Sequence, residues 1–223
     1  MIRVLKVGGA AASPAQLVAS MRRRGVGVVV VHGGGPQITA MCRARGIEPS
    51  FVDGQRVTGA AVLEVVGQGL SHENARLVAD LRQAGVQAAG VVGALVAAPV
   101  NDPRLGLVGE VQRVNCAPLR ELLADGCVPV VNPFAGLNVN ADHAAAAVAV
   151  AIGADELAFL SDVPGVLDSA GGVIRRIAAA DVAGLVAQGT IIGGMLPKLA
   201  AGTHAVQGGV WRVWIGSETL VTA

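Results

Sequence analysis

Two short runs of apolar residues place the strongest limit on the fold of this chain. They are VGVVVV at residues 26–31 and CVPVV at residues 127–131. Neither run alternates between apolar and polar side chains, so each predicts a strand that is covered on both faces. Helical patterns separate such runs along the chain. This order predicts an α/β fold, a three-layer αβα sandwich with a mainly parallel central sheet.

The remaining elements follow the same alternation. We expect a hairpin or exposed flap at residues 50–59, a short β excursion at 107–115 and a turn or hairpin at 161–174. The other expected strands are 2–7, 86–92, 156–160 and 211–215, and the expected helices are 13–25, 36–45, 60–84, 117–126, 141–153, 178–188 and 195–207.

The composition bounds the class of protein. A chain of 223 residues suits one large domain or two lobes that share a core. With no Tyr and few other aromatic residues, that core must consist of Val, Leu, Ile and Ala. The formal net charge of +1 argues against a nucleic-acid partner or a membrane surface, and no apolar run is long enough to span a bilayer. We expect Cys42, Cys116 and Cys127 to be free thiols in a reducing cytoplasm.

The chain uses lysine in only two places. Of 17 basic residues, Lys6 and Lys198 alone are Lys, and both lie beside glycines, in KVGG and GGMLPK. Arginine is a planar fork, whereas lysine is a compact point charge on a flexible stem. The pair is either a chance of codon drift or the mark of a site that needs two point charges. Lys198 would also begin a helix, where it opposes the helix dipole, so we expect an anion nearby.

Glycine-rich segments follow the first two strands. KVGGA begins at Lys6, and HGGGP occupies residues 32–36. Ligands of open α/β sheets bind at the carboxyl ends of the strands, and backbone N–H groups of such loops can bind anions. The alternative is a tight turn without a ligand. Neither a dinucleotide fingerprint nor a Walker loop is present.

A third polar segment, NVNAD, precedes the helix expected at 141–153. Asn140 or Asp142 could cap this helix. A cap does not explain Asn138, which lies on the same side of the extended segment as Asn140.

Six motifs in this order resemble the amino acid kinase superfamily, and within it the acetylglutamate kinases. They are KVGG, VVHGGGP, DGQRVTG, NVNAD, LSDVPGVL and GTIIGGMLPK. The resemblance covers nearly the whole chain. It implies the amino acid kinase fold, with residues 1–154 as an amino-acid-substrate lobe that carries a dimer surface and residues 155–223 as a nucleotide-binding lobe. It also implies transfer of a phosphoryl group from ATP to the side-chain carboxylate of N-acetyl-L-glutamate, the second step of arginine biosynthesis.

The resemblance implies a role for each matched residue. Lys6 and Lys198 stabilise the transferring phosphoryl group, and Asp142 orients both lysines. Gly34 and Gly35 contact the amino-acid substrate. Arg56 grips its α-carboxylate, and Asn138 holds its acetylated end. The residues implied to bind ATP are Gly8, Gly9, Asp162, Val163, Pro164, Gly165, Val166, Leu167, Thr190, Ile191 and Ile192.

The chemistry agrees with these roles, because an ionised acceptor carboxylate needs no general base and the reaction needs charge neutralisation and in-line positioning. We expect Mg²⁺ to arrive with the nucleotide and no separate protein metal site. We further expect a cytoplasmic homodimer without arginine feedback. Two alternatives are a kinase that acts on carrier-bound aminoadipate or glutamate in lysine biosynthesis and a non-catalytic regulator that binds a small anion.

Overall fold

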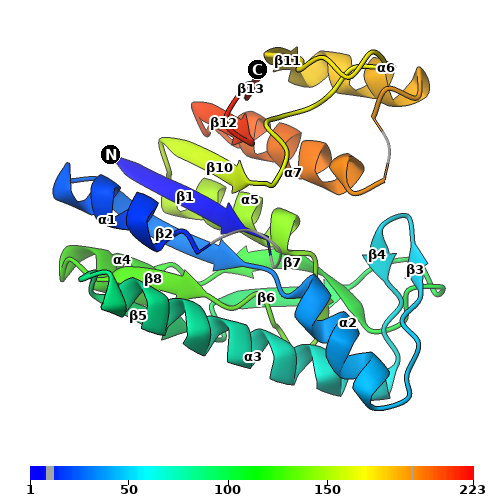
Figure 1. The fold of residues 1–223 in the computed structure, drawn as a ribbon, viewed down its shortest axis with the longest axis horizontal. Coiled ribbons are helices and arrows are strands. Elements are labelled where there is room, and N and C mark those ends of the chain that lie inside the picture. The colour runs from blue at the N-terminus through cyan, green and yellow to red at the C-terminus, as the bar shows by residue number, and fades with distance from the viewer. Residues whose placement is uncertain (9–12, 192) are drawn as a thin grey trace.

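The structure of this chain is a computed structural model that describes residues 1–8, 13–191 and 193–223. Within these residues, eight strands form one central sheet (Figure 1). They are β1 (Ile2–Val7), β2 (Gly27–His32), β5 (Ala88–Val91), β8 (Val128–Val131), β10 (Glu156–Leu160), β11 (Arg176–Ala178), β12 (Arg212–Ile215) and β13 (Thr219–Thr222). Their order is β11-β13-β12-β10-β1-β2-β8-β5. All neighbours are parallel except β12 and β13, which confirms the expected mainly parallel sheet.

Helices cover both faces of this sheet. They are α1 (Ala15–Arg23), α2 (Gly35–Ala44), α3 (Ala60–Gln83), α4 (Ala117–Ala124), α5 (Ala141–Ile152), α6 (Val182–Ala187) and α7 (Met195–Gln207). Along β2, Val28 and Val30 join the cluster that contains α1 and α3, whereas Val29 and Val31 join the cluster that contains α4, α5 and α7. Successive strand side chains point to opposite faces, so a continuous apolar run is buried on both sides. The three-layer sandwich is confirmed.

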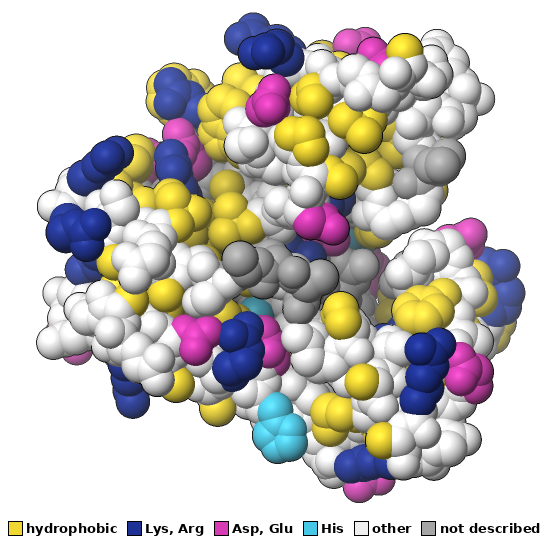
Figure 2. Space-filling model, viewed as in Figure 1, with side chains coloured by type: hydrophobic (Ala, Val, Ile, Leu, Met, Phe, Trp, Pro, Cys, Tyr) yellow, Lys and Arg dark blue, Asp and Glu magenta, His cyan; other side chains and the backbone are white. Residues whose placement is uncertain are grey.

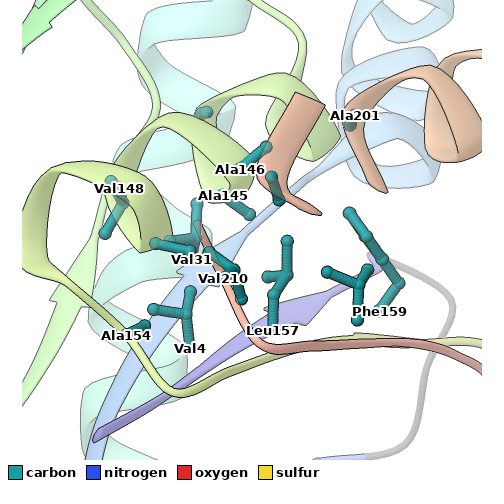
Figure 3. Close-up of a cluster of buried hydrophobic side chains, with 14 of the residues drawn as sticks. Val4, Val31, Ala145, Ala146, Val148, Ala154, Leu157, Phe159, Ala201 and Val210 are labelled. Carbon is teal, nitrogen blue, oxygen red and sulfur yellow. The ribbon is translucent and has the colours of Figure 1, made fainter. Parts of the chain in front are cut away.

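Small side chains let α5 approach the sheet closely. Figure 3 shows Ala145 and Ala146 of α5 beside Val4, Leu157 and Phe159 of the sheet. All five side chains are fully buried. Alanine adds little width to a helix, so the backbone of α5 can lie close to the strands and to α7. This packing fixes where the first turn of α5 meets the edge of the sheet.

Two small sheets complete the fold. The flap expected at residues 50–59 contains the hairpin β3 (Phe51–Val52) and β4 (Gln55–Arg56). A three-stranded sheet of β6 (Leu95–Pro99), β7 (Val108–Val114) and β9 (Asn138–Val139) packs against α5 through β7. We did not expect β6 or β9, nor β11 and β13 of the central sheet. The helix expected over 178–188 is shorter in the structure, where α6 begins at Val182 after β11 and a 3-10 turn. Within the described residues, no helix is both long and apolar enough to cross a membrane.

The register of the central strands brings the polar segments to one edge of the sheet. Gly8, Gly33, Asn132 and Ser161 directly follow β1, β2, β8 and β10, at the carboxyl ends of four adjacent strands. Lys6 is in register with Val31 and Phe159, whose side chains belong to the cluster on the α5 side. The side chain of Lys6 therefore extends from the sheet toward α5 rather than toward α1.

Candidate active site

A cavity of about 360 Å³ lies at this carboxyl edge. Figure 2 shows the surface hollowed between the C-terminal elements above and the part below that carries the β3–β4 hairpin. A cavity of this size suits a small molecule. The residues expected from the sequence that line it are Lys6, Gly8, Gly34, Gly35, Arg56, Asn138, Asp142, Asp162 and Lys198.

Both lysines of the chain meet at one carboxylate oxygen. The Nζ atom of Lys6 lies 2.9 Å from Oδ1 of Asp142, and the Nζ atom of Lys198 lies 3.4 Å from the same atom. The three side chains are about nine-tenths buried. Two like charges this close in a poorly hydrated site repel each other, and the carboxylate between them offsets that repulsion. The arrangement presents two fixed ammonium groups to the cavity.

Asn140 leaves the carboxylate of Asp142 free for this role. Its Oδ1 accepts hydrogen bonds from the backbone N–H groups of Asp142, at 2.8 Å, and His143, at 3.3 Å. Asn140 is therefore the N-cap of α5. This settles the alternative left open by the sequence, because the capping side chain is Asn140 and Asp142 lies in the first turn. An acidic side chain is favourable there because it faces the positive end of the helix dipole.

The environment of Lys198 lowers the pKa of its ammonium group. Burial is the main cause, and the nearby charge of Lys6 acts in the same direction. Asp142 opposes both effects through its charge and its hydrogen bond, and Asp162 opposes them through its charge. The ring of Phe159 lies 5.5 Å from Lys198 Nζ and adds a weaker attraction for the cation. The two carboxylates therefore help to keep Lys198 charged.

The guanidinium of Arg56 is held on one side and free on the other. Its NH2 atom donates to the carbonyl oxygen of Gly35 at 3.0 Å and to Oγ1 of Thr39 at 2.8 Å. Its plane lies over the ring of Phe51, 4.8 Å from the centroid. The NH1 atom is buried and has no hydrogen-bond partner among the described residues. Burial lowers the pKa of Arg56, yet a guanidinium stays charged, so an anion in the cavity would satisfy NH1.

A buried histidine supports the glycine-rich turn. His32 is fully buried, and its Nδ1 lies 2.9 Å from the carbonyl oxygen of Gly33. A carbonyl only accepts, so Nδ1 carries the proton. Its Nε2 then accepts from Nδ2 of Asn74 at 3.0 Å, and that amide also bonds the carbonyl of Val130 at 2.9 Å. Burial is the main cause that lowers the pKa of His32, so its ring is neutral and orients the turn.

Several residues expected at a nucleotide site do not line this cavity. Val166 and Ile191 are core residues, so their side chains pack inside the protein. The carbonyl oxygen of Pro164 accepts from the N–H groups of Ser217 and Glu218, which ties this loop to the turn between β12 and β13. Val163, Gly165, Leu167 and Thr190 also lie away from the cavity lining. Gly9 and Ile192 lie outside the described residues.

Of the lining residues that were not expected from the sequence, three lie beside expected ones. Phe51 stacks on Arg56 from the flap, Gly33 belongs to the glycine-rich turn, and Ser161 follows β10. Phe51 had a detectable signal, since it is one of only three Phe in the chain and lies near Arg56. Gly33 and Ser161 lie within motifs whose neighbours were selected, and only the folded chain shows that they face the cavity.

Two ammonium groups that share a carboxylate, in the same cavity as an unsatisfied guanidinium N–H, provide what phosphoryl transfer to an acid requires. The fold and this site together define an α/β phosphotransferase with an anionic acceptor. The chain belongs to the amino acid kinase family, whose model matches residues 1–217.

Named relatives narrow the comparison. The acetylglutamate kinase of Geobacillus kaustophilus (strain HTA426) is 42% identical over 96% of this chain and 89% of its own length. The acetylglutamate kinase of Jannaschia sp. (strain CCS1) is 41% identical over 93% of this chain and 79% of its own length. These similarities confirm the resemblance found in the motifs.

Solved structures agree with the fold. A protein from Streptococcus mutans UA159 superimposes with a TM-score of 0.93 at 30% identity, covering 100% of this chain and 98% of that one. Carbamate kinase from Giardia lamblia bound to AMP-PNP superimposes with a TM-score of 0.75 at 14% identity, covering 99% and 98%. The second likeness is one of fold alone.

Proposed function

We propose that this chain transfers the γ-phosphoryl group of ATP to the side-chain carboxylate of N-acetyl-L-glutamate. The products are N-acetylglutamyl 5-phosphate and ADP, in the second step of arginine biosynthesis. The observation that carries the proposal is the convergence of Lys6 and Lys198 on Asp142 at the edge of the sheet. The substrate is inferred from the named relatives, which are acetylglutamate kinases over most of this chain.

The site chemistry suits an acyl phosphate as product. A side-chain carboxylate is ionised at neutral pH, so it can attack phosphorus without a general base. One carboxylate oxygen forms a bond to the γ-phosphorus while the bond from that phosphorus to the bridging oxygen breaks, and ADP leaves with the electron pair. Lys6 and Lys198 stabilise the charge on the phosphoryl oxygens during transfer. Asp142 keeps the two ammonium groups charged and oriented.

The acceptor is held by the half of the cavity near the flap. Arg56 NH1 binds the α-carboxylate, because a buried guanidinium N–H without a partner favours an anion. Asn138 binds the acetamido group, and the N–H groups of Gly34 and Gly35 contact the substrate. These roles place the reactive carboxylate toward the lysines.

The donor is held at the other end of the cavity, by Gly8 and Asp162, and by segments that lie beyond its lining. We assign ATP to Gly8, Gly9 and the segments 162–167 and 190–192, with the core residues Val166 and Ile191 contributing backbone groups only. Residues 155–223 form the nucleotide-binding lobe, and residues 1–154 form the acceptor lobe with the dimer surface. Among the described residues, no three His, Cys, Asp or Glu side chains gather as a metal site. Mg²⁺ would enter with the nucleotide, where it would neutralise phosphate charge.

The test is a kinase assay in which hydroxylamine traps the acyl phosphate. The purified chain is offered ATP with N-acetylglutamate, N-acetylaminoadipate or glutamate. We expect hydroxamate and ADP in equal amounts with N-acetylglutamate and much less product with the other two. Preference for N-acetylaminoadipate would support the carrier-linked alternative. ATP binding without any product would support a regulator.

We also propose a cytoplasmic homodimer without arginine feedback. Sedimentation of the purified chain should give twice the monomer mass, and arginine should leave the kinase rate unchanged. A hexamer, or inhibition by arginine, would contradict this part of the proposal without affecting the assigned reaction.

A further inference from the structure

Thr58 joins Arg56 and Asn138, two of the residues assigned to the acceptor. Its hydroxyl donates to the backbone carbonyl oxygen of Arg56 at 2.8 Å, and its Oγ1 lies 2.8 Å from Nδ2 of Asn138. Thr58 itself is fully buried and does not line the cavity. The threonine therefore stands behind the cavity wall and contacts both residues from the protein side.

The hydrogen-bond roles at Thr58 are fixed by valence. A backbone carbonyl can only accept, so the single hydroxyl proton points to Arg56. The Oγ1 atom then has only lone pairs left for Asn138. The atom of Asn138 that faces Thr58 must therefore be the amide nitrogen, because two acceptors would repel each other. The hydrogen-bond network therefore decides which atom of the Asn138 amide is the nitrogen and which is the oxygen.

The backbone around Thr58 is held from a second direction. Its N–H donates to the carbonyl oxygen of Leu105 at 2.9 Å, and its carbonyl accepts from the N–H of Leu107 at 2.7 Å. The carbonyl of Leu107 in turn accepts from the N–H of Asn138 at 3.0 Å. The close approach at Gly106 requires glycine, because a Cβ would lie 2.6 Å from the carbonyl oxygen of Thr58 and φ is +67°. The hydroxyl has little freedom to move.

We infer that Thr58 is a positioning residue that turns the amide oxygen of Asn138 into the acceptor pocket, so that the site selects a substrate with an N–H group there. The Nδ2 edge of Asn138 faces the buried threonine, and Asn138 lines the cavity. The Oδ1 edge of the planar amide is left for the cavity, and no other hydrogen bond of this side chain is seen among the described residues. This inference rests on the proposed function.

The chemical consequence is a preference for an amide over an ester. The acetamido group of N-acetylglutamate carries one N–H donor, which a fixed carbonyl oxygen can accept. In 2-acetoxyglutarate an ester oxygen replaces that nitrogen, so two oxygens would face each other. A site built to bond an N–H group rejects the analogue that lacks it. Without Thr58, the Asn138 amide can rotate and offer its nitrogen to the ester oxygen instead.

The experiment compares Thr58→Val with Thr58→Ser. Valine keeps the branched shape but removes the hydroxyl and its hydrogen bonds, whereas serine keeps the hydroxyl. We measure kcat/KM for N-acetylglutamate and for 2-acetoxyglutarate. For the wild type we expect the amide to be preferred by about 30-fold. Thr58→Val should lower this ratio by about fivefold or more, mainly through a higher KM for N-acetylglutamate. Thr58→Ser should stay within about twofold of the wild type.

Controls separate positioning from general damage. Thr222→Val, a matched change at the far strand β13, should leave the ratio unchanged. In an Asn138→Ala background, Thr58→Val should change the ratio no further, because the residue through which it acts is gone. Should Thr58→Val fail to fold, Thr58→Ala serves in its place.

The outcomes are distinct. A wild-type ratio that survives Thr58→Val or Thr58→Ala would overturn the inference and leave the proposed function standing. A wild type that makes no acyl phosphate from N-acetylglutamate would overturn both.

Discussion

Lys6 and Lys198 approach the same atom, Oδ1 of Asp142, at 2.9 and 3.4 Å, although one lies on the first strand and the other in the last helix. Each ammonium group is almost buried. Charges removed from water act over short distances with little screening. The two ammonium groups are therefore well suited to stabilise a transient negative charge placed between them. This geometry and its surroundings lead to four predictions.

The first concerns the identity of the cation at position 6. Lys6→Arg should lower kcat by well over about tenfold, because a bulky planar guanidinium cannot occupy the place of a compact ammonium group beside Asp142. The melting temperature should change by only a few degrees, on the order of 4 °C. The matched reverse change at an exposed helix end, Arg24→Lys, should leave kcat unaltered. A fully active Lys6→Arg protein would remove the argument for a point charge.

The second concerns the acceptor pocket. Arg56→Lys should raise KM for N-acetylglutamate by about tenfold, since a lysine loses the planar fork that reaches both the pocket and Gly35. KM for ATP should stay near the wild-type value, because this side chain is not part of the proposed nucleotide site. Arg113→Lys, on an exposed part of β7, is the matched control. Steady-state kinetics with each substrate varied in turn make the measurement. An unchanged KM for N-acetylglutamate would mean that Arg56 is a structural residue of the flap and does not bind the acceptor.

The third concerns the alkaline side of the pH–rate profile. The proposed mechanism needs Lys198 charged, and burial lowers the pKa of Lys198 below its ordinary value of 10.5. Activity should therefore fall as pH rises through the lowered pKa of Lys198, at a lower pH than the one at which a free lysine loses its proton. Asp142→Asn removes the carboxylate that raises this pKa, so the fall should move to lower pH and kcat should drop by about a hundredfold.

Asp125→Asn, at an exposed helix end, is the control for that profile. It changes the net charge by the same amount as Asp142→Asn but should leave both kcat and the alkaline limb in place. If activity fell at the same alkaline pH in both variants, the coupling between Asp142 and Lys198 would not determine that fall.

The fourth concerns acid stability. His32 is buried and neutral, and its pKa in the folded protein lies below the ordinary 6.5. The unfolded chain therefore binds a proton at a higher pH than the folded chain does. The free energy of unfolding should decrease as pH falls from 6.5 through the lowered pKa of His32, by about 1.4 kcal/mol for each unit between the two pKa values.

Urea unfolding at several pH values measures this loss. The charged groups that act on His32 are Glu73, which raises its pKa, and Arg76, which lowers it. His32→Asn should flatten the dependence, because asparagine can still donate to Gly33 but does not titrate. Burial lowers the pKa of His143 as well, so His143→Asn shows how much of the slope that second histidine carries. A slope unchanged by His32→Asn would mean that this ring is not the acid-sensitive group.

Much of the fold was predictable because its signals are local. The apolar run at 26–31, with no polar residue in it, required cover on both faces, and β2 is buried by helices on both sides. The helix expected over 195–207 is α7 with the same bounds. Strands β6 and β9 were missed because LVAAP and NV are short and carry little pattern. They are strands only because β7 lies between them.

The candidate site divides in the same way. Lys6 and Lys198 could be selected because lysine is rare in this chain, and the family's motifs assign roles to both and to Asp142. The sequence left the helix cap open between Asn140 and Asp142, whereas the supports given by Asn74 and Thr58 left no mark in it. Such contacts join segments far apart along the chain, so no local pattern encodes them.

The sequence by itself determined the alternation of strands and helices, the largely aliphatic core and the family to which the chain belongs, since these depend on the order and chemistry of neighbouring residues. Only the tertiary structure decided that two lysines share one oxygen of Asp142 and that a buried threonine orients Asn138. The physical reason is that hydrogen bonds and charge interactions act over a few ångströms. Which side chains come within that range is set by how the helices pack on the sheet.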